Sequence, residues 1–291
     1  MRRFPRVEAN IRLKEELMKE LEQKYEALGF TNDLIFKYVL TSDIELCREL
    51  ISRIDPEIDT EGIHYVDSEK EIIIGVKDEK RVRLDIVTET PGSINDLEMF
   101  RYKPKIFSKT ARYNATMIDA QLTRSKLPAD LPDVNVIFLC TYDPFGYGEP
   151  IYHAQAQLYE HPECDYNEGR RICILTNKGI EKAPEKLKPV IQLLTGKNEE
   201  LNDDFYRRIQ AAVKEIKTDP EVRRSAMNWL EKEDAIRREG REEGREEEVL
   251  NGIRVLIKTL RELNLSEEEI FAKTDEAYPD RKDTIREIMK A

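Results

Sequence analysis

Apolar residues recur at helical spacing near the start of the chain. Residues 10–28 carry apolar side chains near every third or fourth position, and Gly29 follows them as a stop signal. A second helix is predicted from Ser42 to Ile54, because Ser42 can cap its first turn and an apolar face follows. Two helices are therefore expected before the first strand.

Three β-like runs come next, at residues 71–76, 81–88 and 94–101. Their connections, residues 77–80 and 89–92, are short and polar, as hairpins require. The pattern predicts two consecutive hairpins.

Alternation within the last two of these runs assigns an acid to a sheet face in each. Asp85 shares a face with Arg83, and Glu98 shares one with Asp96 and Phe100. If the runs pair as a hairpin, the carboxylates of Asp85 and Glu98 converge on a site that favours a hard divalent cation. Two carboxylates with Mg²⁺ could hold a water near a phosphodiester, so the pair points to a nuclease.

The middle of the chain predicts further sheet and helix. A helix is expected at residues 108–124, and the continuous apolar run 134–141 is typical of a strand buried on both faces. Two more β-like runs follow at 151–159 and 170–177. This order predicts an α/β fold with a mixed central sheet flanked by helices.

Beyond residue 183 the chain becomes helical and charged, with amphipathic segments at 183–195 and 201–218. We expect one domain at 1–218, a charged helical linker at 219–248 and a small helical module at 249–291. The four-residue repeat near the end of the linker is also compatible with a helix that self-associates. In the module, Ser266 and Glu269 form a predicted capping box. We assign the C-terminal helices to homo-oligomerisation or partner binding.

Composition sets the outer limits. The chain has 291 residues, of which 40% are hydrophobic, an ordinary value for a soluble protein. No run reaches the roughly 18 apolar residues of a membrane span, and the N-terminus lacks the apolar core of a signal peptide. A cytoplasmic protein without a membrane partner is expected.

The cysteines and histidines do not suggest a site. Cys47, Cys140, Cys164 and Cys173 lie far apart, with no Cys-x-x-Cys pair, so buried thiols are favoured over zinc or disulfides. The three histidines are scattered and receive no role.

The net charge of −11 opposes binding to nucleic acid, because neutralised phosphates dominate DNA affinity. The distribution of charge is more favourable. Nine basic residues lie between positions 77 and 112: Lys77, Lys80, Arg81, Arg83, Arg101, Lys103, Lys105, Lys109 and Arg112. With a metal screening Asp85 and Glu98 this region would be positive, although ordinary solvated hairpins are the alternative.

Several of these segments together resemble one family. They are Phe30-Thr-Asn-Asp-Leu-Ile-Phe-Lys37, Arg83-Leu-Asp-Ile86, Asp96-Leu-Glu-Met-Phe100, residues 109–119, residues 136–146 and the charged repeat at 239–246. In this order they are similar to the recombination-promoting nucleases, also described as transposases, of the PD-(D/E)xK superfamily. The likeness extends from about residue 28 to about residue 250.

The resemblance implies a PD-(D/E)xK-like sheet and a DNA endonuclease that depends on Mg²⁺ (or Mn²⁺). Asp85 and Glu98 would be its metal ligands and catalytic acids. In this superfamily an acid from a helix before the core often joins the metal site; Asp33 and Glu45 are both candidates. DNA is the implied partner.

One position departs from the family pattern. A Gln or Lys is usual two residues after the second acid, and here that residue is Phe100, which can neither donate a hydrogen bond nor carry charge. The role could pass to a nearby cation, Arg101, Lys103 or Lys105, with Lys103 as the predicted catalytic residue. The alternative is a catalytically impaired homologue that binds DNA or assembles proteins.

The resemblance also suggests which side chains touch the nucleic acid. The candidates are Arg83, Arg101, Lys105, Lys109, Arg112 and Tyr113. For Tyr113, helix capping or core packing is an equally open role.

Overall fold

The computed structural model describes residues 5–74, 80–122, 127–164, 166–197 and 201–290, without the side chains of 5–14, 69–74, 80–83, 117, 119–122 and 128. The chain divides into two compact units, one ending at Ala226 and the other beginning at Met227. Helix α7 (Pro220–Glu262) belongs to both units and runs unbroken through the expected boundary at residue 248.

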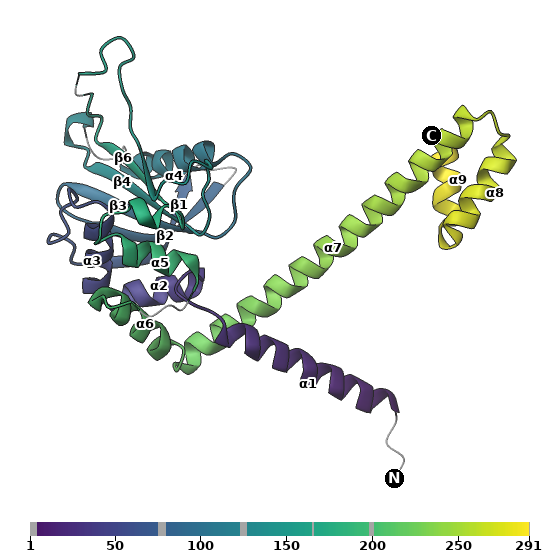
Figure 1. Cartoon of the computed structure of the whole chain (residues 1–291), viewed down its shortest axis with the longest axis horizontal. Helices are drawn as coiled ribbons and strands as arrows, with labels where there is room; N and C mark the ends of the chain where they lie inside the picture. Colours follow the sequence, from purple (N-terminus) through teal and green to yellow (C-terminus); the bar gives the residue numbers. More distant parts are fainter. Residues whose placement is uncertain (1–4, 75–79, 123–126, 165, 198–200, 291) are drawn as a thin grey trace. The chain divides into compact units, whose positions relative to one another are not determined.

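Six strands of the described residues form one mixed sheet in the first unit (Figure 1). They are β1 (Val66–Ile74), β2 (Lys80–Glu89), β3 (Ser93–Phe100), β4 (Asp133–Cys140), β5 (Ile151–Ala154) and β6 (Arg170–Leu175). Their spatial order is β1-β2-β3-β4-β6-β5. The pairs β3–β4 and β4–β6 are parallel, whereas β1–β2, β2–β3 and β5–β6 are antiparallel. The expected mixed α/β sheet with flanking helices is confirmed.

One face of the sheet is covered by α4 (Phe107–Leu122), which connects the parallel strands β3 and β4 (Figure 1). Phe107, Ala111 and Ala115 of α4 are buried with Val136 and Phe138 of β4. The apolar residues of α4 are four positions apart and share one face of the helix, and this face packs on the alternate residues of β4 that point toward it. Parallel strands need such a crossover, since a tight turn cannot join them.

Four helices cover the other face: α2 (Asp33–Ser42), α3 (Ile44–Ile54), α5 (Lys188–Thr195) and α6 (Asp204–Ile216). Their core includes Phe36 of α2 and Phe205 of α6, which are fully buried with Ile137 of β4. A fully buried side chain of this size stabilises the fold by about 1.5–3 kcal/mol. β4 is therefore buried on both faces, as its apolar run predicts.

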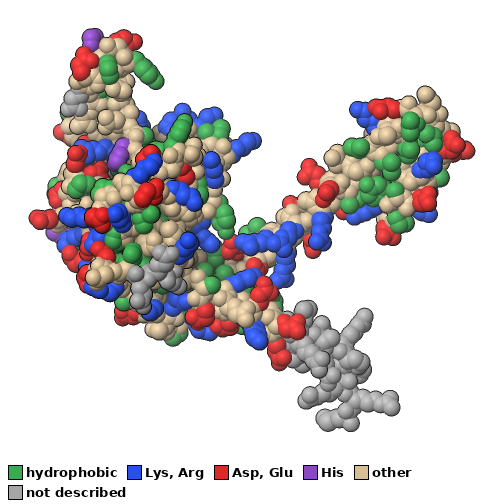
Figure 2. Space-filling model, viewed as in Figure 1, with side chains coloured by type: hydrophobic (Ala, Val, Ile, Leu, Met, Phe, Trp, Pro, Cys, Tyr) green, Lys and Arg blue, Asp and Glu red, His purple; other side chains and the backbone are tan. Residues whose placement is uncertain are grey.

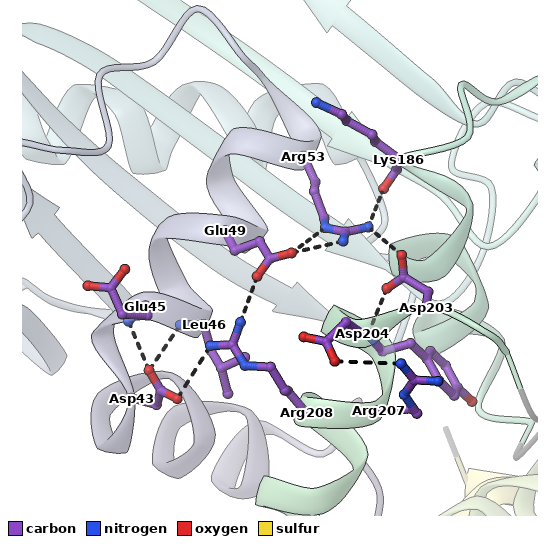
Figure 3. A network of polar contacts seen from close by, with 11 residues as sticks. Asp43, Glu45, Leu46, Glu49, Arg53, Lys186, Asp203, Asp204, Arg207 and Arg208 are labelled. Carbon is purple, nitrogen blue, oxygen red and sulfur yellow. Dashed lines mark hydrogen bonds and ion pairs between the residues drawn. The ribbon is translucent and has the colours of Figure 1, made fainter.

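Ion pairs join α3 to α6 at the edge of this layer (Figure 3). Glu49 of α3 accepts hydrogen bonds from Arg53 at 2.8 Å and from Arg208 of α6 at 2.9 Å. Arg53 also donates to Asp203 at 3.2 Å, and Asp203 caps the first turn of α6 through the N–H of Tyr206. The polar faces of these two amphipathic helices thus neutralise each other.

The N-terminal helix α1 (Pro5–Glu26) is anchored by its last two turns. Leu21 and Tyr25 are buried, and the Tyr25 hydroxyl donates to the carbonyl oxygen of Lys217 at 2.8 Å. Three short 3₁₀ turns lie among the described residues, at Pro128–Asp130, Ile180–Lys182 and Pro279–Arg281.

The second unit packs the end of α7 against α8 (Glu267–Ala277) and α9 (Lys282–Lys290). Its core is a small aliphatic cluster: Ile253, Ile257, Ile270 and Ile285. The capping box of Ser266 and Glu269 is present at the start of α8, as the sequence predicts. Asn264 adopts a left-handed backbone conformation (φ 56°) after α7 and allows the chain to turn.

Three expectations about elements need correction. The cap of α3 is Asp43, whose carboxylate accepts from the N–H groups of Glu45 and Leu46, whereas Ser42 ends α2. Helix α2 itself was not expected. β5 ends at Ala154, so the run predicted to residue 159 is mostly loop.

Two further expectations can be compared only in part. The connection expected at residues 77–80 falls largely on positions 75–79, outside the described residues. Within the described part of the chain, no helix combines the length and the apolar character needed to cross a lipid bilayer.

The buried thiols are confirmed for Cys47, Cys140 and Cys173, while Cys164 is exposed; all four are unbridged.

Candidate active site at the split between two strands

The pairing between β2 and β3 stops where the two predicted acids begin. Its register runs from Glu89 opposite Ile94 to Ile86 opposite Leu97. Past this point β2 continues to pair with β1 alone, so backbone groups of β2 and β3 are left without the ladder.

Asp85 and Glu98 fill this split with reciprocal hydrogen bonds. The backbone N–H of Asp85 donates to Oε1 of Glu98 at 3.2 Å, and that of Met99 donates to Oδ2 of Asp85 at 3.1 Å. Each carboxylate thus bonds to the backbone of the opposite strand. The structure brings the two acids together, while their catalytic and metal-binding roles stay predictions.

The alternation expected along β2 breaks at the same place. Leu84 packs with the cluster beneath α4, whereas Ile86 packs with the helical cluster on the other face. Residues two apart on a regular strand share a face, so β2 is irregular between them. Asp85 lies at this irregularity, and the simple assignment of faces along the run was wrong there.

A third acid, Asp96, lies fully buried beside Glu98. Neither Asp96 oxygen receives a hydrogen bond from an N–H or O–H group of the described residues, so its contact with Glu98 is favourable only if the two share a proton. Burial raises the pKa of Asp96 well above its usual value, and the charge of Asp85 raises it further. Spacing of two residues before Glu98 was the available signal, but Asp96 was not predicted as a site residue.

The same causes act on Glu98. Burial raises the pKa of this carboxyl well above its usual value, and the charges of Asp96 and Asp85 add to the rise. The hydrogen bond from the Asp85 N–H acts in the opposite direction. Like charges in a low-dielectric site favour a shared proton or a bound cation.

Helix α2 contributes two charged side chains from successive turns. The carboxamide of Asn32 caps the helix by accepting from the N–H groups of Leu34 and Ile35, which sets Asp33 in the first turn. Lys37, one turn later, extends its ammonium to within 2.7 Å of Asp85 Oδ1. Both members of this ion pair are largely buried, with 14% and 16% of their side chains exposed.

Asp33 belongs to the same electrostatic cluster. Burial raises the pKa of Asp33, the charge of Asp85 adds to the rise, and the cations Arg101 and Lys37 oppose it. Oδ1 of Asp33 is buried and has no hydrogen-bond partner among the described residues. A charged pair four residues apart in the Asp33–Lys37 segment was a signal that sequence reasoning did not use.

Glu45, the other candidate for the helical acid, lies elsewhere. It is exposed at the start of α3 and pairs with Arg48 at 2.6 Å (Figure 3 shows its carboxylate apart from the ion-pair network). Of the two alternatives left open by the sequence, the structure places Asp33 beside Asp85.

Phe100 fills an apolar position beneath α4. Its ring lies 5.0 Å from that of Phe138 and 5.6 Å from that of Phe107, both in edge-to-face geometry. The position therefore serves the core and supplies no polar group to the acids. The cation that does contact one of the acids is Lys37, which pairs with Asp85 and which sequence reasoning missed.

The expected basic substitutes follow β3 directly. Arg101 is half-buried and acts on Asp33 electrostatically, whereas Lys103 and Lys105 are exposed in the next loop. No contact of Lys103 with Asp85 or Glu98 is found among the described residues, so its catalytic role stays a prediction.

The expected nucleic-acid residues fall in two groups. Lys109, Arg112 and Tyr113 are exposed on α4, and they lie with Arg101 and Lys105 on one continuous stretch of chain. Arg83 lies on β2, but its side chain is outside the described part of the structure.

The site's donor chemistry fits a hard divalent cation. Lys37 pairs with Asp85, and Arg101 and Lys37 act electrostatically on Asp33. Carboxylate oxygens, such as those of Asp33, Asp85, Asp96 and Glu98, are the ligands that Mg²⁺ and Mn²⁺ prefer. As the side chains stand, no three Asp, Glu, His or Cys of the described residues converge tightly enough to hold a metal ion.

A separate cavity lies at the far edge of the sheet. It has a volume of about 1040 Å³ and is lined by the end of α3, by β5 and by β6. Arg171 and Cys173 line it, with Arg171 paired to Glu57 at 2.7 Å. None of the four acids of the split reaches this cavity.

Comparison with known proteins gives no further guide to the site. No protein-family model, no curated protein and no solved structure matches this chain.

Proposed function

We propose that this protein is a DNA endonuclease that depends on Mg²⁺ or Mn²⁺ and uses the split between β2 and β3 as its active site. The observation that carries the proposal is that Asp85, where the pairing of β2 and β3 stops, exchanges hydrogen bonds with the strand of Glu98, and that its charge acts on Glu98, Asp96 and Asp33, whose pKa values are all raised. Perturbed acids in such a cluster are typical of functional sites.

In this proposal Asp85 and Glu98 hold the metal, and Asp33 is the helical acid beside them. Bound metal supplies Lewis acidity at water and phosphate and neutralises developing charge. The chain's own residues orient the carboxylates: the N–H of Asp85 fixes Glu98, and the N–H of Met99 fixes Asp85.

Lys37 takes the place of the polar residue that Phe100 does not provide. Its ammonium, 2.7 Å from Asp85, orients that carboxylate and adds positive charge where a phosphate would approach. Lys103, exposed in the loop after β3, is the alternative cation.

Cleavage of supercoiled plasmid in Mg²⁺ or Mn²⁺ tests the proposal. We expect nicking by the native chain, at least about 100-fold less with Asp85→Asn or Glu98→Gln, and a comparable loss with Lys37→Met but not with Lys103→Met. Glu45→Gln is the matched control, because it removes an exposed acid outside the cluster. Nicking that survives both acid substitutions would refute this active site.

The burial of Phe100 favours a second candidate, a homologue that has lost cleavage and retains DNA binding or an assembly role. In that case the native chain binds DNA without nicking it, with or without metal. Gain of nicking in Phe100→Gln would then identify the missing third group as the cause.

A further inference from the structure

The segment from Arg101 to Tyr113 has the most one-sided charge near the acids. It contains five basic residues and no acidic one, in a chain whose net charge is −11. Lys103, Lys105, Lys109 and Arg112 are all exposed, and within the described residues none of these four forms an ion pair. By contrast, the arginines between α3 and α6 are neutralised by carboxylates (Figure 3).

Exposed aromatic rings accompany these cations. Tyr102 is 66% exposed and Tyr113 43% exposed in the same segment. The loop after β4 adds Phe145, 41% exposed, and Tyr147, 78% exposed. In the view of Figure 2, acidic and basic side chains are interspersed over the first unit.

The two loops lie side by side. β3 and β4 are parallel, so the segments that follow them begin at the same side of the sheet, where the carboxyl ends of both strands lie. The hydroxyl of Tyr142 donates to the carbonyl oxygen of Tyr102 at 3.1 Å, and the ring of Phe145 lies 5.8 Å from that of Phe107. We call the exposed groups of residues 101–113 and 145–147 the basic aromatic platform.

The carboxylate of Asp143 fixes the shape of the loop after β4 by accepting hydrogen bonds within it. Asp143 accepts hydrogen bonds from the N–H groups of Phe145, Gly146 and Gly148, and from the hydroxyl of Tyr152. Gly146 and Gly148 take left-handed conformations, with φ of 83° and 68°, on either side of Tyr147. Tyr147 is therefore displayed on a backbone that is already ordered.

The platform begins at the acid cluster. Arg101 follows Phe100 at the end of β3, and its charge acts on the half-buried Asp33. A strand that lies along the platform therefore has its backbone led toward Asp85 and Glu98.

We propose that the basic aromatic platform binds an unpaired strand of DNA, so that the substrate is single-stranded DNA or DNA with a single-stranded segment. Proteins that bind single strands combine cations, which follow the nucleic-acid backbone, with exposed aromatic rings, on which the bases stack. A duplex keeps its base faces stacked inside and offers the rings only edges. This inference rests on the proposed function for its choice of DNA, but not on cleavage.

Fluorescence anisotropy with a labelled oligonucleotide, alone and annealed to its complement, tests the proposal in EDTA, where cleavage is absent. The native full-length chain should bind the single strand at least about tenfold more tightly than the duplex. Tyr102→Ala with Tyr147→Ala should weaken single-strand binding by about tenfold or more. Tyr159→Ala is the matched control, because this tyrosine is 96% exposed in another loop.

Salt dependence separates the two kinds of contact. Lys105→Ala with Lys109→Ala should lower the dependence of log K on log salt by about one to two, whereas the tyrosine variant should leave it unchanged. Equal affinity for duplex and single strand, tighter binding to RNA of the same sequence, or full affinity in the tyrosine variant would each overturn the proposal. Single-strand binding by a native chain that does not nick DNA in Mg²⁺ or Mn²⁺ would support the single-strand proposal and refute the proposed nuclease. Nicking of duplex DNA without a preference for binding single strands would support the nuclease and refute the single-strand proposal.

Discussion

A fully buried carboxyl with no donor, such as Asp96, is costly in its ionised form. Burial and neighbouring negative charges both favour the protonated acid, which is why the pKa of Asp96 is raised. Asp143 is in the opposite situation. Partial burial raises the pKa of Asp143, but hydrogen bonds from three backbone N–H groups and Tyr152 outweigh this effect and lower it.

These two aspartates predict opposite pH dependence. A raised folded pKa gives stability that is present below the unfolded pKa, near 4, and is lost as pH rises. Asp96→Asn should therefore stabilise the metal-free protein by about 1–3 kcal/mol near pH 7 and have little effect near pH 4. Thermal unfolding in EDTA at both pH values measures the difference.

Asp143→Asn provides the counterpart. Its lowered folded pKa contributes stability that is present above the unfolded pKa and is lost as pH falls through the folded pKa, so the variant should melt lower near pH 7 and approach the native chain only well below pH 4. For the other aspartate, a lower melting temperature of the Asp96→Asn protein at neutral pH would contradict the assignment of a repulsive acid cluster.

The cluster also predicts a response to metal. Adding Mg²⁺ or Mn²⁺ near neutral pH should raise the melting temperature of the native chain, because a ligand that binds only the folded state stabilises it. The shift should disappear in Asp85→Asn and persist in Glu45→Gln. An equal shift in all three proteins would indicate metal binding outside the split.

Only part of this site follows from the sequence. Asp85 and Glu98 could be found because a short polar turn fixes the pairing of their runs, which is local information. Asp33 was one of two candidates for the helical acid, but the choice between Asp33 and Glu45 could not be made from the sequence. Lys37 was missed, since α2 was unrecognised and its contact with Asp85 depends on the packing of a distant helix. Asp96 was visible as a neighbour of Glu98, but its complete burial is a property of the assembled sheet.

At the scale of elements, the three glycines of α7 differ in their surroundings. A Cβ at Gly240 or Gly244 would meet no atom, whereas a Cβ at Gly252 would clash with the Tyr278 hydroxyl. The first two weaken the helix without any packing reason, and the third permits close contact within the second unit.

Alanine substitutions should separate these cases. Gly240→Ala and Gly244→Ala should each stabilise the helix by up to about 1 kcal/mol. Gly252→Ala should destabilise the second unit, because Tyr278 must shift. Circular dichroism during thermal unfolding measures both effects, and stabilisation by Gly252→Ala would contradict the close packing against Tyr278.

The strands were easier to predict than the helix ends. The run at 134–141 is apolar without a break from Val136 to Cys140 and coincides closely with β4. At the junction of α2 and α3, Ser42 and Asp43 are both competent caps, and only the backbone conformation decides between them. The charged segment 219–248, expected as a helical linker, is helical and lies within the continuous α7.

At the scale of the whole molecule, the second unit retains exposed apolar side chains beyond its aliphatic core. Val255 of α7 is 56% exposed, and Leu263, just after α7, is 65% exposed. The expectation that the C-terminal helices mediate homo-oligomerisation or partner binding can be tested at these residues.

Light scattering after size exclusion tests self-association. The native chain should elute as an oligomer, and Val255→Glu with Leu263→Glu should shift it toward the monomer. Leu158→Glu, which alters an exposed leucine of the first unit, should have no effect. An oligomer that withstands the double substitution would place the contact elsewhere.

The packing of α2 has a consequence for the order of events during synthesis. Ile35, Phe36 and Val39 share their core with Phe205 and Ile209 of α6. Domains generally fold as units while the chain emerges from the ribosome. We therefore expect Asp33 and Lys37 to reach Asp85 only after α6 has been translated, so that a chain ending before α6 carries all four acids without the assembled site. For the proposed nuclease, we therefore expect no cleavage until the polypeptide is about three-quarters made.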